Sequence, residues 1–139
     1  MGPIYGTIFM DMAAAAEEAE DISLPLLADM MESGLTGLQE IVEARVGDKT
    51  LVDTLSPAVD ALKHGAEGAA PFADTLKIMK TAAECGRDST KDMVAKFGRS
   101  SRLGERSRGV LDAGAASCCI LLQAMADGML YQAGEPTVW

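Results

Sequence analysis

Residues at helical spacing are the feature that most limits what this chain can fold into. Between Pro71 and Phe97, apolar and small residues recur at alternating steps of four and three: Phe72, Leu76, Met79, Ala83, Gly86, Thr90, Met93 and Phe97. Such spacing lines one side of an α-helix and predicts a seam between antiparallel helices. One continuous helix is therefore expected over residues 71–97.

Two more helices are predicted before this seam. An alanine-rich stretch from Thr7 to Glu20 follows a loop-like opening over residues 1–6. Ser23 then has the side chain of an N-cap, with a proline in the first turn after it, and this second helix is expected to end near Gly47. Its predicted apolar stripe is Leu27, Met31, Leu38 and Ile41.

A third helix and a last helix complete the set of five. Thr50 and Asp53 have the spacing of a capping box, and the helix they open is expected to kink at Pro57. Its predicted stripe is Leu51, Leu55, Val59 and Leu62. The last helix is expected to begin near Asp112 or Ala113 and to direct four side chains into the core: Ile120, Leu121, Ala124 and Leu130.

Composition supports one all-α domain over residues 1–139. Aromatic residues make up only 4% of the chain, and helix-forming residues dominate. A net charge of −9 argues against a nucleic-acid partner, because a phosphate backbone would be repelled. No run long enough to span a membrane, no signal peptide and no metal-type cysteine spacing is recognised. We therefore expect a cytoplasmic protein without a membrane partner.

The segment from Gly98 to Gly114 is the strongest candidate for a binding site. It holds four glycines and four arginines, and its net charge is +2 in a chain of −9. Glycines allow close backbone approach to phosphates, and the segment ends at a helix N-terminus that favours anions. The alternative stays open: Asp112 caps the last helix, and the arginines pair with acidic neighbours on a solvated surface.

The stretch Gly47-Asp-Lys-Thr50 is superficially similar to the end of a phosphate-binding P-loop. The required glycine spacing is absent, and no strand precedes it, so a P-loop is rejected. The expected role of this stretch is structural: Thr50 and Asp53 cap the third helix, and the Lys49 side chain is solvated.

Three stretches together resemble the L subunit, or L domain, of dihydroxyacetone kinases. They are Gly2-Pro-Ile-Tyr-Gly6, Gly47-Asp-Lys-Thr50 with Asp53 and Pro57 after it, and residues 98–114 with the core Leu103-Gly-Glu-Arg-Ser107. The resemblance implies an antiparallel helical barrel that binds ADP or ATP. It also implies phosphoryl transfer to a short ketose held by a separate K subunit or domain, with a phosphocarrier subunit as phosphate source in some members.

The same resemblance implies the residues that contact the nucleotide. They are Met1, Gly2, Leu51, Arg99, Asp112, Ala113 and Gly114. The family usually has Asp-Pro-Gly where this chain has Asp112-Ala113-Gly114, and His-Gln where it has Val110-Leu111. These differences leave another short ketose, such as erythrulose, open as the substrate. No catalytic residue is assigned.

A further expectation concerns what precedes the first glycine-rich stretch in the family. Family members hold two magnesium ions with an aspartate cluster upstream of it, so we expect this chain to lack the N-terminal helices and the metal ligands, and to be inactive alone. Self-association through the apolar seam that those helices would cover is expected. The alternative function is a non-catalytic regulatory or scaffolding module.

Overall fold

The computed structural model describes residues 2–97 and 99–132. Five α-helices and two 3₁₀-helices form this part of the chain: α1 Gly2–Ala15, α2 Leu24–Ile41, α3 Val52–Glu67, α4 Phe72–Ser89, η1 Thr90–Asp92, η2 Arg99–Ser107 and α5 Ala113–Gln132. No strand occurs within it. The all-α prediction and the expected number of α-helices are confirmed.

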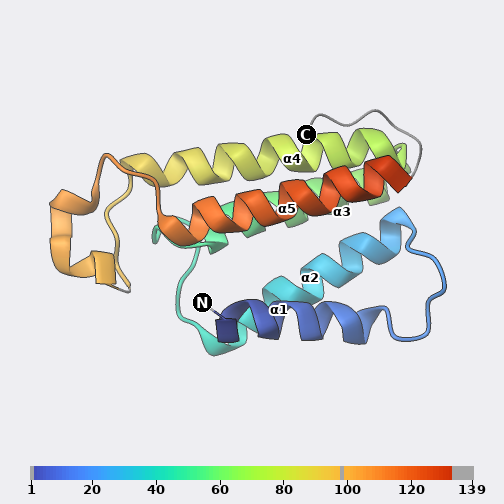
Figure 1. Ribbon diagram of the computed structural model, residues 1–139, viewed down its shortest axis with the longest axis horizontal. Coiled ribbons are helices and arrows are strands. Elements are labelled where there is room, and N and C mark those ends of the chain that lie inside the picture. The colour runs from blue at the N-terminus through green and yellow to red at the C-terminus, as the bar shows by residue number, and fades with distance from the viewer. Residues whose placement is uncertain (1, 98, 133–139) are drawn as a thin grey trace.

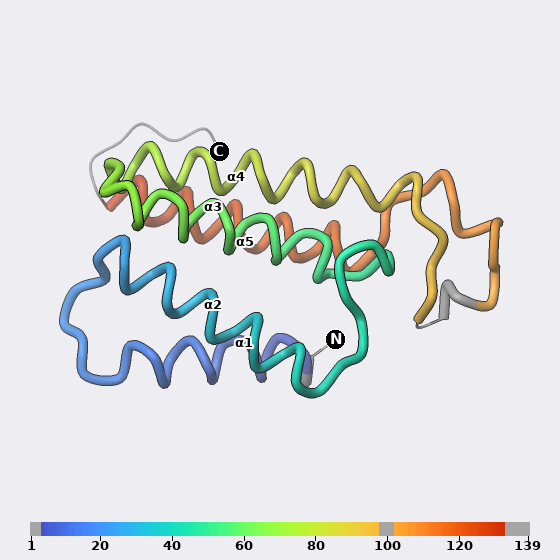
Figure 2. Tube along the Cα trace, turned by 180° about the vertical axis from the view of Figure 1, so that it is seen from behind, coloured from blue at the N-terminus to red at the C-terminus, as the bar shows by residue number. Residues whose placement is uncertain are grey.

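The helices pack in chain order. α1 lies on α2, α2 on α3 and α3 on α4, while α5 packs against both α3 and α4. Figure 1 shows α1 and α2 on one side of the molecule and the other three helices on the other. Seen from behind in Figure 2, the connection between α4 and α5 leaves the bundle at one end. We call this connection the arm (residues 90–97 and 99–112).

The core is built mainly from leucine, methionine and alanine, and the stripe predicted for the third helix is confirmed. Its four members, Leu51, Leu55, Val59 and Leu62, are all buried. The stripe predicted for α5 is wrong in part, because Ile120 is 67% exposed and Ala124 is also exposed. Ile41 in α2 and Phe97 in the arm are exposed as well.

The first helix begins earlier than predicted. It starts at Gly2 and ends at Ala15, so the expected loop over residues 1–6 and the helix end near Glu20 are wrong. Pro3 fits a first helical turn, because its fixed φ is helical and the missing N–H would have no partner there. Packing of Ile8 and Met12 in the core offsets the low helix propensity of the glycines.

The second helix has the predicted start and a different end. The Ser23 hydroxyl accepts a hydrogen bond from the Leu26 amide, which confirms the N-cap. The helix stops at Ile41 rather than near Gly47, because Val42 is extended. The Arg45 guanidinium then donates to the carbonyls of Val42 and Ala44 at 3.0 and 2.9 Å, which satisfies acceptors just beyond the helix end.

The seam helix also ends early. α4 stops at Ser89, and the predicted continuation to Phe97 is replaced by η1 and the arm. The hydroxyls of Ser89 and Thr90 donate back to the carbonyls of Gly86 and Arg87, at 2.6 and 2.7 Å. Such back-bonding competes with the helical ladder.

The loop that precedes α3 folds around the buried carboxylate of Asp53. One carboxylate oxygen accepts from the Gly47 amide at 2.7 Å and the other from the Thr50 amide at 2.9 Å. Gly47 has a φ of +100°, which favours glycine. The bond from the Thr50 amide to the Asp53 carboxylate is one half of the predicted capping box. The other half is not formed, because the Thr50 hydroxyl accepts from the Val52 amide instead of the Asp53 amide.

The solvated side chain expected for Lys49 is wrong. Its side chain was expected in solvent, but the residue is only 3% exposed. The ammonium donates to the carbonyls of Thr90, Met93 and Val110, at 2.7, 3.3 and 2.5 Å. All three acceptors belong to the arm, so one buried cation holds both ends of the arm against the loop before α3.

α5 is long and apolar enough to cross a membrane by length and composition, contrary to the sequence expectation. Its 18-residue test window has a mean hydropathy of 1.4, and 39% of that window is buried in the fold. One such helix is weak support for a membrane span, because core helices pass the same test. Within the bundle, α5 supplies Asp127, which pairs with Lys80 of α4 at 2.5 Å.

The first prediction concerns Lys49. Replacing it by methionine keeps an unbranched stem but leaves three carbonyls without their charged donor, so the free energy of unfolding is expected to fall by about 3 kcal/mol. Urea denaturation followed by circular dichroism measures the change. The matched control is Lys63→Met, because Lys63 only forms a surface pair with Glu32 and should matter little. Equal effects of the two substitutions would refute the structural role of Lys49.

The second prediction concerns the three cysteines, which are all free. Burial raises the pKa of the Cys118 thiol to about 12, and burial also raises the pKa of Cys119. Because the thiolate is the reactive species, only the exposed Cys85 should react quickly with an aromatic disulfide reagent. Titration should give one fast thiol in the native chain and three in denaturant. Two or three fast native thiols would contradict the packing of α5.

Candidate functional site

A largely apolar cavity of about 350 Å³ lies where the loop before α3 meets the start of α5. Its lining comes from α1, α2, the loop, the start of α3, the arm and the start of α5: Ile4, Leu38, Val42, Glu43, Ala44, Lys49, Thr50, Leu51, Val52, Phe97, Asp112 and Gly114. We call it the α5-start cavity. Its volume lies at the lower end of the range typical of small-molecule sites.

Three of the seven predicted nucleotide contacts line this cavity. Leu51 reaches it from the loop, and Asp112 and Gly114 reach it from the start of α5, although about 60 residues separate the two segments. Ala113 lies between Asp112 and Gly114 and is exposed.

Of the remaining predicted contacts, Gly2 and Arg99 lie near the lining in the chain, and Met1 is not described. Gly2 begins α1, two residues before Ile4, which lines the cavity. Arg99 begins η2, two residues after Phe97 of the lining, and its side chain lies outside the described part of the structure. Met1 lies outside the described residues.

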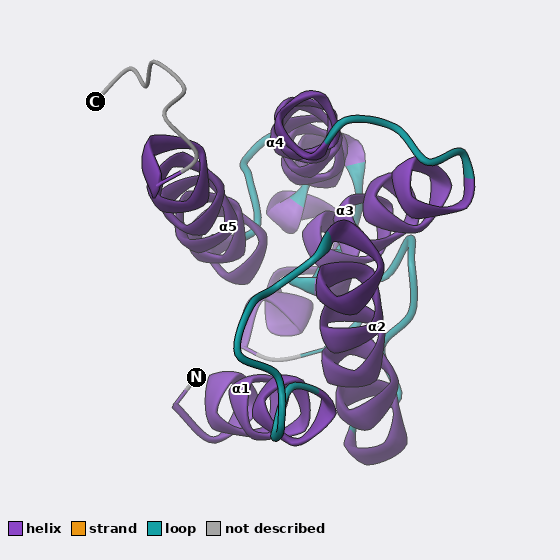
Figure 3. Cartoon of the chain, turned by 90° about the vertical axis from the view of Figure 1, so that its right-hand side faces the viewer, coloured by secondary structure: helices purple, strands orange, loops and turns teal. Residues whose placement is uncertain are grey.

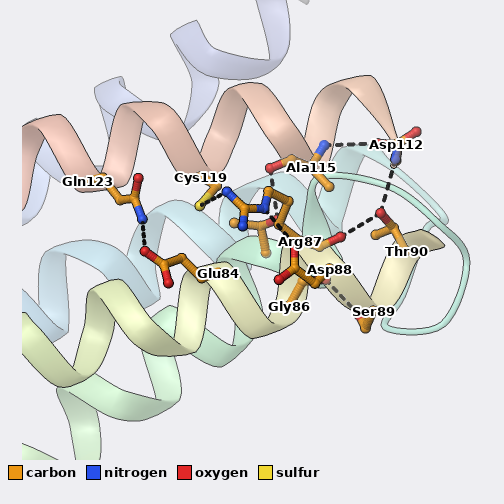
Figure 4. A network of polar contacts seen from close by, with 11 residues as sticks. Glu84, Gly86, Arg87, Asp88, Ser89, Thr90, Asp112, Ala115, Cys119 and Gln123 are labelled. Carbon is orange, nitrogen blue, oxygen red and sulfur yellow. Dashed lines mark hydrogen bonds and ion pairs between the residues drawn. The ribbon is translucent and has the colours of Figure 1, made fainter. Parts of the chain in front are cut away.

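Hydrogen bonds fix the turn that opens α5. The Asp112 carboxylate accepts from the Ala115 amide at 2.9 Å, and its own amide donates to the Thr90 hydroxyl at 3.0 Å. The Thr54 hydroxyl donates to the Ala115 carbonyl at 2.9 Å. Figure 4 shows Asp112 joined by one dashed line to Ala115 at the start of α5 and by another to Thr90, which follows the end of α4. The predicted capping role of Asp112 is therefore present.

The same view shows two further links between α4 and α5 (Figure 4). The Gln123 amide donates to the Glu84 carboxylate at 2.5 Å, and the Arg87 guanidinium reaches the Cys119 sulfur at 3.8 Å. A hydrogen bond to Asp88 raises the pKa of Arg87. These contacts hold the start of α5 in register with the end of α4.

The cavity combines an apolar wall with an end that favours anions. The first amides of α5 have no intrahelical acceptors, and the helix dipole places positive potential at Gly114. The Lys49 ammonium adds a positive charge at the lining, although its protons are directed to carbonyls. Glu43 is the acidic group besides Asp112, and it is exposed. A ligand with a flat apolar part and an anionic part fits these surroundings.

A second cavity, of about 500 Å³, lies between α1 and α2 and has the opposite character. Its lining includes four carboxylates, from Asp11, Asp29, Glu32 and Glu40. An anionic ligand entering it would meet like charges at close range, which is unfavourable. The electrostatics therefore favour the α5-start cavity for a phosphate compound.

The acidic member of the Gly47–Thr50 stretch also has a structural role. Asp48 accepts from the Arg45 amide at 2.8 Å and lies 3.1 Å from the Lys96 ammonium. The amide of Arg45, and then the hydrogen bond from Lys96, lower the pKa of the Asp48 carboxyl. Asp48 thus ties the loop to the arm just before Phe97.

The arginines of the arm agree in part with the alternative in which they lie on a solvated surface and pair with acidic neighbours. Arg108 pairs with Glu105 at 3.1 Å, within the arm itself. Arg102 and Arg106 are exposed. Gly104 has a φ of +55° and divides the η2 segment into two parts. The arm therefore presents cationic side chains at one end of the bundle.

The described residues do not fit a magnesium site. Among residues 2–97 and 99–132, no group of three or more histidine, cysteine, aspartate or glutamate side chains is arranged to hold a metal ion. Hard divalent cations prefer several oxygen ligands.

Most of the apolar wall could not be identified from the sequence. Ile4, Leu38 and Val42 belong to helical stripes or ends, and nothing local marks them as lining a cavity. Phe97 was assigned to the helical seam, but it lies in the arm beside the cavity. One usable signal existed: Phe97 directly precedes the glycine that opens the arginine-rich segment.

Comparison with known proteins agrees with the resemblance found in the sequence. The DAK2 domain matches residues 1–127. The ADP-binding subunit DhaL of the PEP-dependent dihydroxyacetone kinase of Escherichia coli (strain K12) is 35% identical over 125 residues, which cover 90% of this chain and 60% of that protein. The corresponding subunit of kinase 1 from Listeria innocua is 37% identical over 124 residues, covering 89% and 57%.

A more distant relative carries a different substrate in its name. The L-erythrulose 1-kinase of Mycolicibacterium smegmatis is 33% identical over 124 residues, covering 88% of this chain and 20% of that protein. The chain spans less than two thirds of the length of the curated relatives it matches. The domain match covers nearly the whole chain, so the chain belongs to the DAK2 domain family.

Proposed function

We propose that the chain binds ADP or ATP in the α5-start cavity and is the nucleotide-binding part of a dihydroxyacetone-type kinase. The observation that carries this proposal is that one cavity is lined by Leu51, Asp112 and Gly114, three contacts expected from the family resemblance. Two relatives are named ADP-binding subunits, which supports the same ligand.

The proposed ligand has one orientation that suits the cavity. The adenine ring packs on the apolar wall of Leu38, Val42 and Phe97, where burial of a flat ring is favourable. The phosphates then lie at the start of α5, near the amides of Ala113 and Gly114, where the helix dipole favours negative charge. Arg99, as first residue of η2, is the proposed cationic contact from the arm.

The proposed reaction is phosphoryl transfer to a short ketose such as dihydroxyacetone or erythrulose, both supported by the names of relatives. The partners we propose are a K subunit or domain that holds the ketose and, in the PEP-dependent form, a phosphocarrier subunit. The chain itself is proposed to be inactive alone, because the described residues offer no ligand cluster for magnesium. Free cysteines agree with a cytoplasmic location.

A second candidate function is a non-catalytic regulatory or scaffolding module. The exposed apolar residues of α5, Ile120 and Tyr131, favour it, since they suit a protein partner. Nucleotide binding separates the two functions: a kinase part binds ADP in the cavity, whereas a scaffold has no need to do so.

The third prediction tests the cavity. Phe97→Ala removes apolar surface from the wall and should weaken ADP binding by about tenfold, since one partly buried aromatic side chain contributes on the order of 1.5 kcal/mol. Isothermal titration calorimetry with ADP measures the dissociation constant. The matched control is Phe9→Ala, because Phe9 has the same 40% exposure but lies outside the lining. If the wild-type chain does not bind millimolar ADP, the proposed function fails.

The fourth prediction concerns magnesium. Because no carboxylate cluster suited to the ion occurs among the described residues, replacing magnesium chloride by EDTA should change the ADP dissociation constant by less than about threefold. The same calorimetric titration, run in both buffers, measures this ratio. A much larger loss of affinity in EDTA would mean that the chain supplies metal ligands, and the proposed inactivity would then be wrong.

A further inference from the structure

Thr90, the residue after the end of α4, is fully buried and does not line the α5-start cavity. Its hydroxyl donates to the Arg87 carbonyl at 2.7 Å and accepts from the Asp112 amide at 3.0 Å. Its carbonyl accepts from the Lys49 ammonium at 2.7 Å. Thr90 therefore joins the end of α4, the loop before α3 and the turn that opens α5.

The bonds around Thr90 close the base of the arm. The Lys49 ammonium, which binds the Thr90 carbonyl, also donates to the Val110 carbonyl at 2.5 Å. Two residues further on, the Asp112 amide returns to the Thr90 hydroxyl. We call these four residues the clasp. Breaking one of these bonds would leave a polar group without its partner away from bulk water, so the clasp fixes where the arm turns into α5.

The clasp decides which amides stay free at the start of α5. Asp112 uses its own amide on Thr90, and its carboxylate accepts from the Ala115 amide at 2.9 Å. Within the part of the chain that the structure describes, the amides of Ala113 and Gly114 have no acceptor. Gly114 lines the α5-start cavity. These two amides are therefore the donors left for an anion, at the end of α5 where the helix dipole is positive.

The Thr90 hydroxyl matters more to the start of α5 than to the end of α4. The two helices pack side by side, as the view along the bundle in Figure 3 shows. The Arg87 carbonyl at the end of α4 also accepts from the Thr90 amide, so it keeps a donor without the hydroxyl. The Asp112 amide has no second acceptor among residues 2–97 and 99–132. Loss of the hydroxyl would therefore release Asp112 first.

We propose that Thr90 is a positioning residue for the phosphate end of the nucleotide site, which it does not touch. Its hydroxyl holds Asp112 in place, and Asp112 in turn fixes the free amides of Ala113 and Gly114 beside the cavity. Hydrogen bonds weaken steeply with distance and angle, so a small shift of these amides would cost the phosphates much of their binding. This inference rests on the proposed function, because it needs a bound nucleotide.

The plainer role for Thr90 is to end α4. Ser89 offers the matched comparison, because its hydroxyl donates in the same way to the Gly86 carbonyl at 2.6 Å (Figure 4). A role confined to the helix end would be common to both residues. The bond to the Asp112 amide belongs to Thr90 and not to Ser89. Substitution of the two hydroxyls therefore separates positioning from helix termination.

The fifth prediction compares three variants of the full chain by calorimetric titration with ADP. Thr90→Val keeps the shape of the side chain and removes the hydroxyl, so the dissociation constant should rise at least about fivefold. Thr90→Ser keeps the hydroxyl and loses a methyl group, so affinity should stay within about twofold of wild type, even where urea denaturation shows a less stable fold. Ser89→Ala removes the neighbouring back-bond and should also stay within about twofold.

Other results would overturn the positioning role. Wild-type affinity in Thr90→Val, or an equal loss in Thr90→Ser or Ser89→Ala, would do so and would leave the nucleotide site standing. A wild-type chain that does not bind millimolar ADP would overturn both. If circular dichroism shows that Thr90→Val does not fold, hydrogen exchange of the wild-type chain decides. Because coupling is reciprocal, ADP should slow exchange of the Asp112 amide at least about fivefold, and unchanged exchange would overturn the proposal.

Discussion

The structure depends on a buried cation. The Lys49 ammonium is buried away from water. It donates hydrogen bonds to the backbone carbonyls of Thr90, Met93 and Val110, which replace its hydration shell. A neutral side chain at this point would remove the charged donor from all three carbonyls. The Thr90 carbonyl would keep its hydrogen bond from the Met93 amide, whereas a buried carbonyl left without any donor costs about 1–3 kcal/mol. The two ends of the arm are thereby closed onto the loop before α3. The same closure brings Leu51 and Asp112 to one cavity, so the proposed nucleotide site and the stability of the arm share one residue.

The fold was predictable where helices are amphipathic and capped locally. The Ser23 cap and the stripe of Leu51 and its partners follow from spacing alone, because one side of each helix is polar. The side of α5 predicted to face the core is wrong at Ile120, which is exposed. A helix that is apolar all round has no periodic pattern that tells which side is buried. The end of α4 was also missed, because the contacts that draw the chain away at Thr90 come from Lys49, 41 residues earlier.

The candidate site was predictable only in its motif residues. Leu51, Asp112 and Gly114 were found because short motifs around them resemble a family, and motif residues are local in sequence. The apolar wall was not found, because Leu38 and Phe97 become neighbours of the motifs only through the packing of α2 and the closure of the arm. Local sequence holds the groups that specify a ligand; the shape that excludes water around it comes from tertiary contacts.

Charge is distributed unevenly over the molecule, and this affects how an anionic ligand approaches it. Residues 1–48 contain ten carboxylates and one basic residue, Arg45, so they carry the entire net charge of −9, and the rest of the chain is neutral on balance. α1 and α2 are therefore the acidic side, whereas the arm gathers arginines at one end of the bundle. An anion is repelled from the larger cavity between α1 and α2 and drawn toward the arm. The α5-start cavity is lined by residues of both regions, so an anion in it would be attracted by the basic arm and repelled by the acidic side, and salt would screen both of these interactions.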